Sequence, residues 1–262
     1  MTPAGGAWFD QLLLVAVASA RFGFAFALVP MFAQDLIPST VRNCIILTLG
    51  GVAFVMQPHV DPATLGAFGW VRLLLKEAVV GIVIGFFFGT MLWALEAAGE
   101  IIDAKIGSTI GQIVEPLGGN QTSLNGALLA RLANVIFMSV GGLSLFVGAI
   151  MQSYAVWPMA ADWPDLDMHG LLLFEGEFGR LVMLAMLFAA PVLTLLYVID
   201  AGLGLLNRFA QQLNVFTLSL SLKSWAATLL LITLIPAFAQ AVIAEVASRN
   251  DVARQIVGVL AR

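Results

Sequence analysis

The sequence predicts an all-α integral membrane protein. Of its 262 residues, 60% are hydrophobic and only 11% are charged, and the mean hydropathy is +0.97. A soluble domain carries about 25% charged residues, so this chain has less than half of that supply. Residues 78–95 are apolar at odd and even positions alike, whereas a transmembrane β-barrel strand alternates apolar and polar side chains. The β-barrel is therefore excluded.

Six apolar segments predict the helices. They cover residues 11–29, 43–56, 78–95, 127–151, 181–199 and 225–246. Several approach the ~20 residues that cross a bilayer core, while the second is short and is expected to be re-entrant, tilted or buried. The sequence contains no internal repeat and no sign of a second domain, so we predict one helical membrane domain over residues 1–262. We expect no cleaved signal peptide, because the first ten residues lack a basic region and a cleavage site.

The charges limit the partners and leave the orientation open. The net charge is −4, which argues against a nucleic-acid partner. Residues 157–179 are acidic and contain two tryptophans, so we expect an outer loop with Trp157 and Trp163 at the membrane surface. With that orientation, five Lys or Arg lie inside and six outside, so the positive-inside rule shows no bias. Cys44, the single cysteine, is expected to be a small buried apolar residue.

Two stripes of residues mark the third apolar segment. Gly81, Gly85 and Gly89 share one helix face, so another backbone can approach closely, either within the chain or from another subunit. A second stripe contains Glu96, Gly99, Glu100, Asp103 and Gly107. Paired carboxylates can serve acid–base chemistry or proton transfer, but no nucleophile or phosphate-binding loop accompanies them. We expect a water-facing or interfacial surface there.

Three further charged residues lie in or beside the apolar segments. A cation in mid-span, such as Arg21, costs about 2.5–3.5 kcal/mol, so it needs a partner. Asp10 is too far along the helix, and we expect a carboxylate elsewhere in the chain or on another subunit. Lys76 and Glu77 are expected to be a solvated helix start. The only histidines are His59 and His169, both in expected outer loops, so we predict neither a metal site nor a cofactor.

Two polar segments are candidate functional regions. Residues 107–123 are rich in glycine and small polar residues, and Pro116 breaks any helix. This segment is either a connecting loop or a mobile element inside a pore, with the candidates Gly107, Gly111, Gln112, Glu115, Pro116, Gly118, Gly119 and Asn120. Residues 207–223 hold amides and hydroxyls between two apolar runs. Such groups cost roughly 2–7 kcal/mol each when unpaired in hydrocarbon. They should therefore line a cavity or a protein interface, with the candidates Asn207, Arg208, Gln212, Asn214, Phe216 and Lys223.

Landmarks over some 200 residues of this sequence match one family in order and spacing. They are Pro30, Pro38 with Arg42 and Asn43, Lys76–Glu77 with Gly81 and Gly85, Glu96 with Gly99, Ile102 and Asp103, Gly107, Pro116, Ala190–Pro191, and residues 204–210. The most specific is the segment 212–219, followed by Lys223. Together they resemble the T subunit of the type III secretion export apparatus (the SctT family), whose flagellar counterpart is FliR. Residues 214–219 are more similar to the virulence-type branch. Gln211 and Ser221 stand where family members commonly have proline, so we assign no kink there.

The resemblance implies a non-enzymatic role in protein export. Such subunits join R and S subunits in a helical assembly, the portal through which unfolded proteins cross the bacterial inner membrane. The U and V subunits and the basal-body rings are neighbours, and membrane lipid is a further contact. The family also implies that the assembly lies largely above the bilayer plane, which would explain the missing charge bias. Residues 107–120 would then resemble a plug, and residues 207–223 would lie near the cytoplasmic entrance.

Three alternatives remain. The first is the flagellar counterpart of the same subunit. The second is a proton-coupled secondary transporter, suggested by Arg21, Glu96, Glu100 and Asp103 in or beside the spans; it should show interrupted spans in both halves, and the sequence has no such symmetry. The third is an intramembrane enzyme, for which no catalytic set lies at a common depth.

Overall fold

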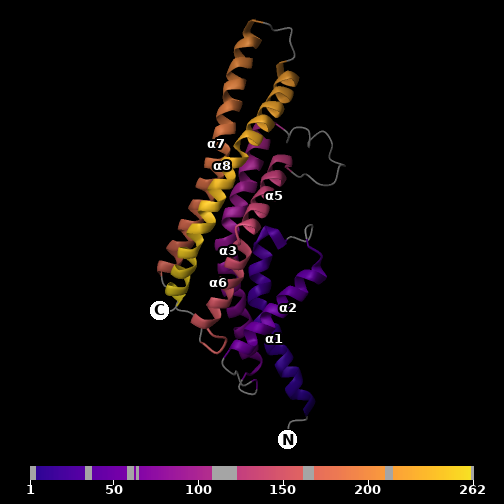
Figure 1. The fold of residues 1–262 in the computed structure, drawn as a ribbon, viewed down its shortest axis with the longest axis vertical. Helices are drawn as coiled ribbons and strands as arrows, with labels where there is room; N and C mark the ends of the chain where they lie inside the picture. The colour runs from indigo at the N-terminus through magenta and orange to yellow at the C-terminus, as the bar shows by residue number, and fades with distance from the viewer. Residues whose placement is uncertain are drawn as a thin grey trace. The chain divides into compact units, whose positions relative to one another are not determined.

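The computed structural model of the chain is built from helices (Figure 1). It describes residues 4–32, 37–57, 62, 65–107, 123–161, 168–209 and 215–260, and within these residues there are helices and turns but no strands. The elements are α1 (Ala4–Leu28), the 3₁₀ helix η1 (Pro30–Phe32), α2 (Ser39–Met56), α3 (Ala67–Ile106), α5 (Leu124–Ser139), α6 (Gly142–Val156), α7 (Met168–Phe209) and α8 (Val215–Leu260). The predicted all-α fold is confirmed.

Helix length is where the structure departs most from the prediction. In the described part of the chain, five helices are long and apolar enough to cross a membrane, or six if the broken pair α5–α6 counts as one span. However, α3 has 40 residues, α7 has 42 and α8 has 46. At 1.5 Å per residue these helices exceed about 60 Å, twice the hydrocarbon thickness of a bilayer. The apolar segments are therefore only the middle parts of longer helices.

The fourth predicted segment, residues 127–151, is not one helix. It is broken between Ser139 and Gly142, where Gly141 has a φ of 79°. Only glycine adopts this left-handed conformation without a steric cost. Two adjacent glycines in a continuous apolar run were the available signal, and hydropathy alone does not register them.

The helices form two compact units that interleave along the chain. Unit 1 comprises Met1–Thr90, Val140–Glu177 and Val246–Arg262, and unit 2 comprises Met91–Ser139 and Phe178–Glu245. The helices α3, α7 and α8 each contribute a stretch to both units. The prediction of a single domain stays a prediction, and each unit is described separately.

The core of unit 1 is aromatic. Phe26 stacks on Phe32 of η1 with ring centroids 4.0 Å apart, and it lies 5.6 Å from Phe146 of α6. Phe88 of α3 reaches the same ring at 5.1 Å. Phe26 and Phe146 are fully buried. Aromatic rings bury 150–250 Å² each, so this cluster supplies much of the apolar burial that holds α1, α3 and α6 together.

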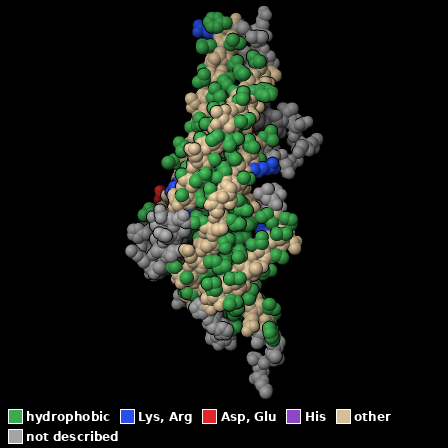
Figure 2. Space-filling view, in the orientation of Figure 1, with side chains coloured by type: hydrophobic (Ala, Val, Ile, Leu, Met, Phe, Trp, Pro, Cys, Tyr) green, Lys and Arg blue, Asp and Glu red, His purple; other side chains and the backbone are tan. Residues whose placement is uncertain are grey.

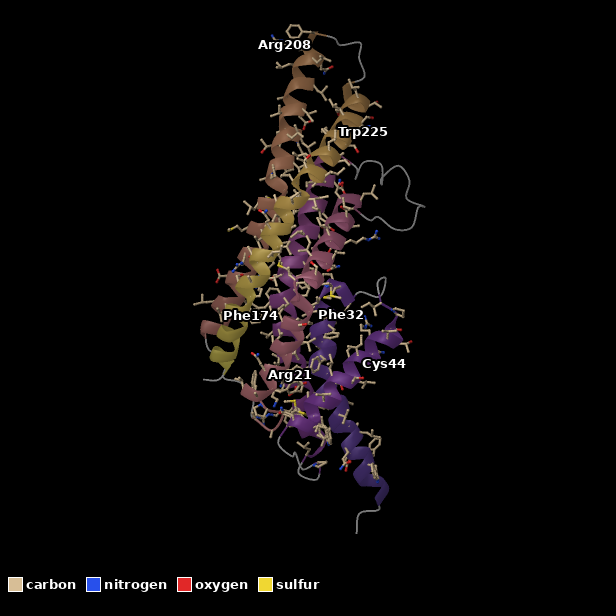
Figure 3. All side chains as sticks on the ribbon, viewed as in Figure 1. Arg21, Phe32, Cys44, Phe174, Arg208 and Trp225 are labelled. Carbon is tan, nitrogen blue, oxygen red and sulfur yellow. The ribbon has the colours of Figure 1, made fainter. Side chains whose placement is uncertain are left out.

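Close backbone contacts complete unit 1. The helix α2 packs against α1 and buries little besides Gly50 and Ala53. A β-carbon at Gly50 would lie 2.5 Å from the Cα of Ser19, so only glycine allows the two backbones to meet there. The remaining residues of α2 are exposed or half-buried, and Cys44 (Figure 3) is exposed. The prediction of a buried Cys44 was wrong, because its apolar neighbours face outward too.

Unit 2 contains a long antiparallel hairpin formed by α7 and α8. Its register is fixed by contacts whose residue numbers rise on one helix and fall on the other. Arg180 pairs with Glu245, the rings of Phe188 and Phe238 lie 5.6 Å apart, and Asp200 pairs with Lys223. Pro191 and Pro236 lie inside the two helices.

Hydrophobic side chains are spread over the whole visible face of the chain, with few charged side chains among them (Figure 2), as expected for a chain that meets lipid or protein along its length.

Candidate functional site

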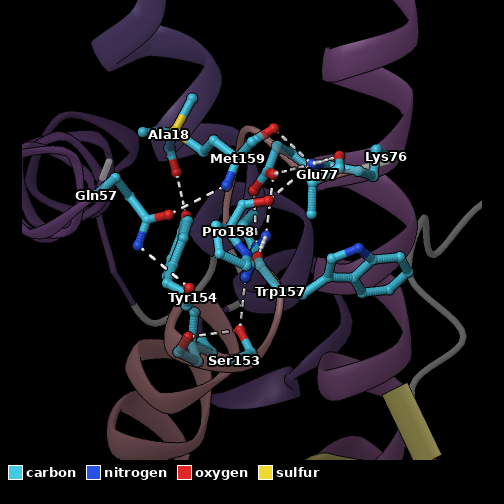
Figure 4. A network of polar contacts seen from close by, with 12 residues as sticks. Ala18, Gln57, Lys76, Glu77, Ser153, Tyr154, Trp157, Pro158 and Met159 are labelled. Carbon is cyan, nitrogen blue, oxygen red and sulfur yellow. Dashed lines mark hydrogen bonds and ion pairs between the residues drawn. The ribbon is translucent and has the colours of Figure 1, made fainter. Parts of the chain in front are cut away.

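A buried ion pair joins two helices of unit 1; Figure 4 shows one partner, Glu77, and the polar contacts around it. The guanidinium of Arg21 on α1 faces Glu77 on α3, with Nε donating to Oε2 at 2.7 Å and Nη2 donating to Oε1 at 2.9 Å. Both side chains are 0% exposed. Two parallel charge-assisted hydrogen bonds are among the stronger side-chain contacts in proteins. The carboxylate that Arg21 requires therefore belongs to the same chain.

The remaining donors of Arg21 reach the end of α6. Nη1 donates to Ser153 Oγ at 2.9 Å, and Nη2 also donates to the carbonyl of Trp157 at 3.1 Å. The guanidinium carbon lies 3.8 Å from the centre of the Tyr154 ring, which is cation–π geometry. The Tyr154 hydroxyl donates to the carbonyl of Ala18. One cation thus ties α1, α3 and α6 together.

Lys76 fixes the turn that follows α6, here called the α6 turn (residues 157–161). Its ammonium donates to three carbonyls, those of Pro158 at 3.0 Å, Met159 at 2.6 Å and Ala161 at 2.9 Å. It also lies 3.8 Å from Glu77 Oε1. Carbonyl groups at a helix C-terminus carry partial negative charge, so this turn is a suitable place for a buried cation.

The expected solvated helix start at Lys76 and Glu77 was wrong. They are 3% and 0% exposed, because α3 begins well before them at Ala67. The apolar run at residues 73–75 was the signal that the helix starts earlier. Trp157, expected at the membrane surface, is buried as well. Its carbonyl is held by Arg21, which draws the whole α6 turn inward.

A second buried ion pair in unit 1 corrects the prediction for residues 157–179. Arg249 of α8 donates from Nη1 to Glu177 Oε2 at 2.7 Å, and its Nη2 lies 3.3 Å from Thr90 Oγ1. Since α7 begins at Met168, Glu177 and His169 belong to a helix and not to an outer loop. For Glu177 the local excess of acid was misleading, because its matching cation comes from the far end of the chain; residues 162–167, including Trp163, lie outside the described residues.

Asp103 in unit 2 holds the start of α5. Its Oδ2 accepts hydrogen bonds from the hydroxyl of Ser123 and, at 2.9 Å, from the backbone N–H of Asn125; its Oδ1 accepts one from the Asn125 side chain. A carboxylate at a helix N-terminus satisfies free N–H groups and complements the helix dipole. Asp103 is 6% exposed, so of the expected water-facing or interfacial surface the water-facing alternative does not hold for this residue, and the interfacial one stays a prediction. Glu96 is half-buried and Glu100 is exposed.

Asp200 forms salt bridges with two lysines in unit 2. Lys105 Nζ from α3 lies 2.8 Å from Oδ2, and Lys223 Nζ from α8 lies 2.8 Å from Oδ1. The ammonium of Lys105 also lies 4.0 Å from the centre of the Tyr197 ring. We call Lys105, Asp200 and Lys223 the lysine clasp. Lys223 was singled out in the sequence, but its partners were not, because they lie on two other helices.

The glycine candidates lie on a buried face of α3. A β-carbon at Gly81 would collide with the carbonyl oxygen of Arg21, and one at Gly85 would lie 2.6 Å from that of Ala25. Gly89 is also buried. These contacts show close packing of α1 on α3 within the chain, and a role of the same face in subunit contact stays a prediction.

Most of the pore and entrance candidates lie outside the described residues. Gly107 is described, with a φ of 94° and its N–H donating to the carbonyl of Asp103 at 3.1 Å. Asn207 and Arg208 are exposed in the last turn of α7, and Phe216 is the second residue of α8. Outside the described residues are Gly111, Gln112, Glu115, Pro116, Gly118, Gly119, Asn120, Gln211, Gln212 and Asn214. Their role stays a prediction.

The geometry is that of a scaffold for helix packing in a membrane. The cations described above on α1, α3 and α8 have fixed acceptors: Arg21, Lys76, Lys105, Lys223 and Arg249. In the described ranges no three His, Cys, Asp or Glu side chains converge as metal ligands would. Bilayer-length apolar helices with buried charges that pair with one another define an α-helical integral membrane protein.

Comparison with known proteins then identifies the family. The chain belongs to the bacterial export proteins, family 1, whose profile matches residues 12–248. It is 32% identical over 225 residues to the Yop proteins translocation protein T of Yersinia pestis (84% of this chain, 85% of the relative). It is 33% identical over 224 residues to the surface presentation of antigens protein SpaR of Salmonella typhimurium strain LT2 (82% of each). It is 27% identical over 225 residues to the flagellar biosynthetic protein FliR of Bacillus subtilis strain 168 (86% and 85%). The resemblance is confirmed: the chain is an export-apparatus component of the bacterial inner membrane, and its relatives work in multi-subunit complexes.

Proposed function

We propose that this chain is the T-type subunit of a type III secretion export apparatus. In this role it joins R and S subunits to form the portal through which unfolded proteins cross the bacterial inner membrane. The observation that carries the proposal is the match to a translocation protein T over 84% of this chain and 85% of that protein. The identities to virulence-type relatives, 28–33%, overlap with the 27–29% to flagellar relatives, but the highest values belong to the virulence type, which favours that branch.

The exposed apolar surface supports assembly with partner subunits. Because α3, α7 and α8 are longer than a bilayer is thick, part of each lies outside the hydrocarbon. Large apolar side chains remain exposed near the ends, such as Leu205 at 63% and Phe209 at 86% on α7. A monomer rarely leaves such patches to water. Protein partners, the R and S subunits first and the U and V subunits and basal-body rings beyond them, would cover them.

The buried charges support a structural role, and we propose that the chain is not an enzyme. Arg21 and Lys76 are held by Glu77 and by main-chain carbonyls, so their hydrogen bonds fix helices and the α6 turn. None of these groups is presented to a substrate. The energy for export would then come from other subunits of the apparatus.

Deletion of the gene is the direct test. Secretion of effector proteins should be abolished and restored by the full chain, and a tagged chain should co-purify with the R and S subunits. Flagellar motility is the matched control, because a virulence-type subunit leaves it intact and the flagellar counterpart does not. Secretion that survives deletion, together with solute transport by the isolated chain in proteoliposomes, would support the transporter alternative.

We also propose that residues 107–120 help to close the resting pore. Support comes from both ends of the segment, since Asp103 holds Ser123 and Asn125 on one side and the N–H of Gly107 on the other. Shortening this segment should raise the ion conductance of the resting complex and leave assembly intact. Replacement by a glycine–serine segment of equal length is the control for chain length. Unchanged conductance in the shortened complex contradicts the plug.

A further inference from the structure

The lysine clasp joins three helices through one carboxylate. Asp200 of α7 meets Lys105 in the last turn of α3 and Lys223 near the start of α8, both at 2.8 Å. Lys105 is two positions from Asp103, the residue that holds the start of α5. The clasp therefore links the α7–α8 hairpin to the place where α3 ends and α5 begins.

An ion pair lies at each end of a long uncharged stretch of this hairpin. Residues 181–199 of α7 and 224–244 of α8 contain no Asp, Glu, Lys or Arg. Arg180 and Glu245 pair at one end, with Nε 2.9 Å from Oε1, and Asp200 and Lys223 pair at the other. At 1.5 Å per residue each stretch spans about 30 Å, the thickness of a bilayer core. The clasp thus lies at the boundary of a bilayer-thick apolar band, where water can reach it.

Exposure separates the clasp from the buried ion pairs of unit 1. The side chains of Lys105, Asp200 and Lys223 are 26%, 32% and 12% exposed, whereas those of Arg21 and Glu77 are 0% exposed. Breaking a buried pair strands a desolvated charge and is costly. Breaking a solvated pair costs little, because water replaces the lost partner. Two lysines that share one carboxylate can also be released one after the other.

Beyond the clasp most described side chains of the hairpin are exposed. From residue 201 to the end of α7 nearly every side chain is exposed, as are Leu218 and Leu222 at the start of α8. Figure 3 marks Arg208 at the end of α7 and Trp225 on α8, both exposed. Among the residues that the structure describes, the clasp is thus the last ion pair between the hairpin and α3 towards the end of α7.

We propose that Lys105, Asp200 and Lys223 form an ionic latch that holds the α7–α8 hairpin against the end of α3 and opens to let the hairpin move away. The inference rests on the proposed function only for its purpose, the widening of an export path. Opening requires no change inside the buried network of unit 1. It should respond to ionic strength, since salt screens exposed charges with a Debye length of about 10 Å at 0.1 M.

The test measures the distance between the hairpin and α3 in the assembled complex. Cys44→Ser removes the single native cysteine, and spin labels are attached at Ala104→Cys on α3 and Leu206→Cys on α7, both exposed positions. The distance distribution is recorded by pulsed electron paramagnetic resonance at low and high salt. An exposed ion pair shifts such an equilibrium roughly 1.4- to 5-fold, and we take the same range for each of the two half-buried pairs of the clasp. Asp200→Asn should therefore raise the ratio of long to short distances by about two- to 25-fold.

Three further measurements distinguish the opening of the latch from a general loss of stability. Glu245→Gln breaks the ion pair at the other end of the same hairpin and should leave the distribution unchanged. High salt should lengthen the distances in the parent protein but not in Asp200→Asn. The charge-swapped triple variant, Asp200→Lys with Lys105→Asp and Lys223→Asp, should restore the short distance.

The latch is overturned if Asp200→Asn has the parent distribution at both salt concentrations. It is equally overturned if Glu245→Gln lengthens the distance as much, because the effect would then belong to the hairpin in general. The distance measurement is independent of secretion. A failed latch leaves the proposed function standing, and a failure of the proposed function appears in the deletion experiment instead.

Discussion

Replacing Glu77 with alanine is expected to lower the free energy of unfolding by about 3–5 kcal/mol. The reason is the burial of its partner. Arg21 is 0% exposed and donates hydrogen bonds to both carboxylate oxygens of Glu77, so the variant leaves a guanidinium charge in a low-dielectric interior without its carboxylate. Lys76 loses its nearest negative group as well. The measurement is denaturant or thermal unfolding of the purified complex, read together with the amount of chain retained in the membrane.

Two variants serve as controls for this prediction. Glu100→Ala removes an exposed carboxylate from the same helix and should change stability by no more than about 0.5 kcal/mol. Replacing Arg21 and Glu77 together with methionine removes both charges, and apolar replacements of a buried pair are often neutral or stabilising. The double variant should therefore recover much of the loss. A Glu77→Ala protein that unfolds like the parent would show that Arg21 does not depend on this carboxylate.

Gly50→Ala is expected to destabilise unit 1 by about 1–3 kcal/mol, the usual cost of forcing an extra methyl into a packed contact. The added carbon would meet the Ser19 side chain and its Cα, the latter at 2.5 Å. Rotation of the serine hydroxyl relieves only part of this clash, so α2 must move away from α1. Thermal unfolding of the complex measures the effect.

The neighbouring glycine is a matched control for this change. A β-carbon at Gly51 meets nothing within 4 Å, and alanine favours a helix over glycine by about 1 kcal/mol. Gly51→Ala should therefore be neutral or slightly stabilising. If both variants lose stability equally, backbone flexibility, and not the close approach of α1 and α2, is the property that the two glycines provide.

The fold class and the positions of the helices follow from the sequence because hydropathy is a local property. The ends of α3, α7 and α8 do not follow from the sequence, because the charged residues near them pair with residues that are distant in the chain. Arg180 and Lys223 flank apolar runs and therefore suggested helix boundaries. In the structure each pairs with an acidic residue on the facing helix of the hairpin, and the helix continues through it.

The sequence predicted that the buried cation requires a partner, but it did not show which residues form the buried network. The cost of a cation in mid-span showed that Arg21 requires a carboxylate. That Glu77 fills this place, with help from Ser153 and the α6 turn, depends on contacts more than fifty residues apart in the sequence. The partners of Asp103 could not be predicted for the same reason. Its position suggested a water-facing or interfacial helix surface, and the structure buries it against the first turn of α5.

The hydrogen bonds from Lys76 to the α6 turn determine which residues of this region can vary during evolution. The ammonium binds only main-chain oxygens, those of Pro158, Met159 and Ala161, and every amino acid supplies such an oxygen. Exchange of these three residues leaves all the acceptors in place, so their identities are restricted only by packing. The shape of the turn is instead encoded by a single side chain 82 positions upstream of Pro158. Variation in the turn can therefore accumulate while Lys76 itself stays fixed.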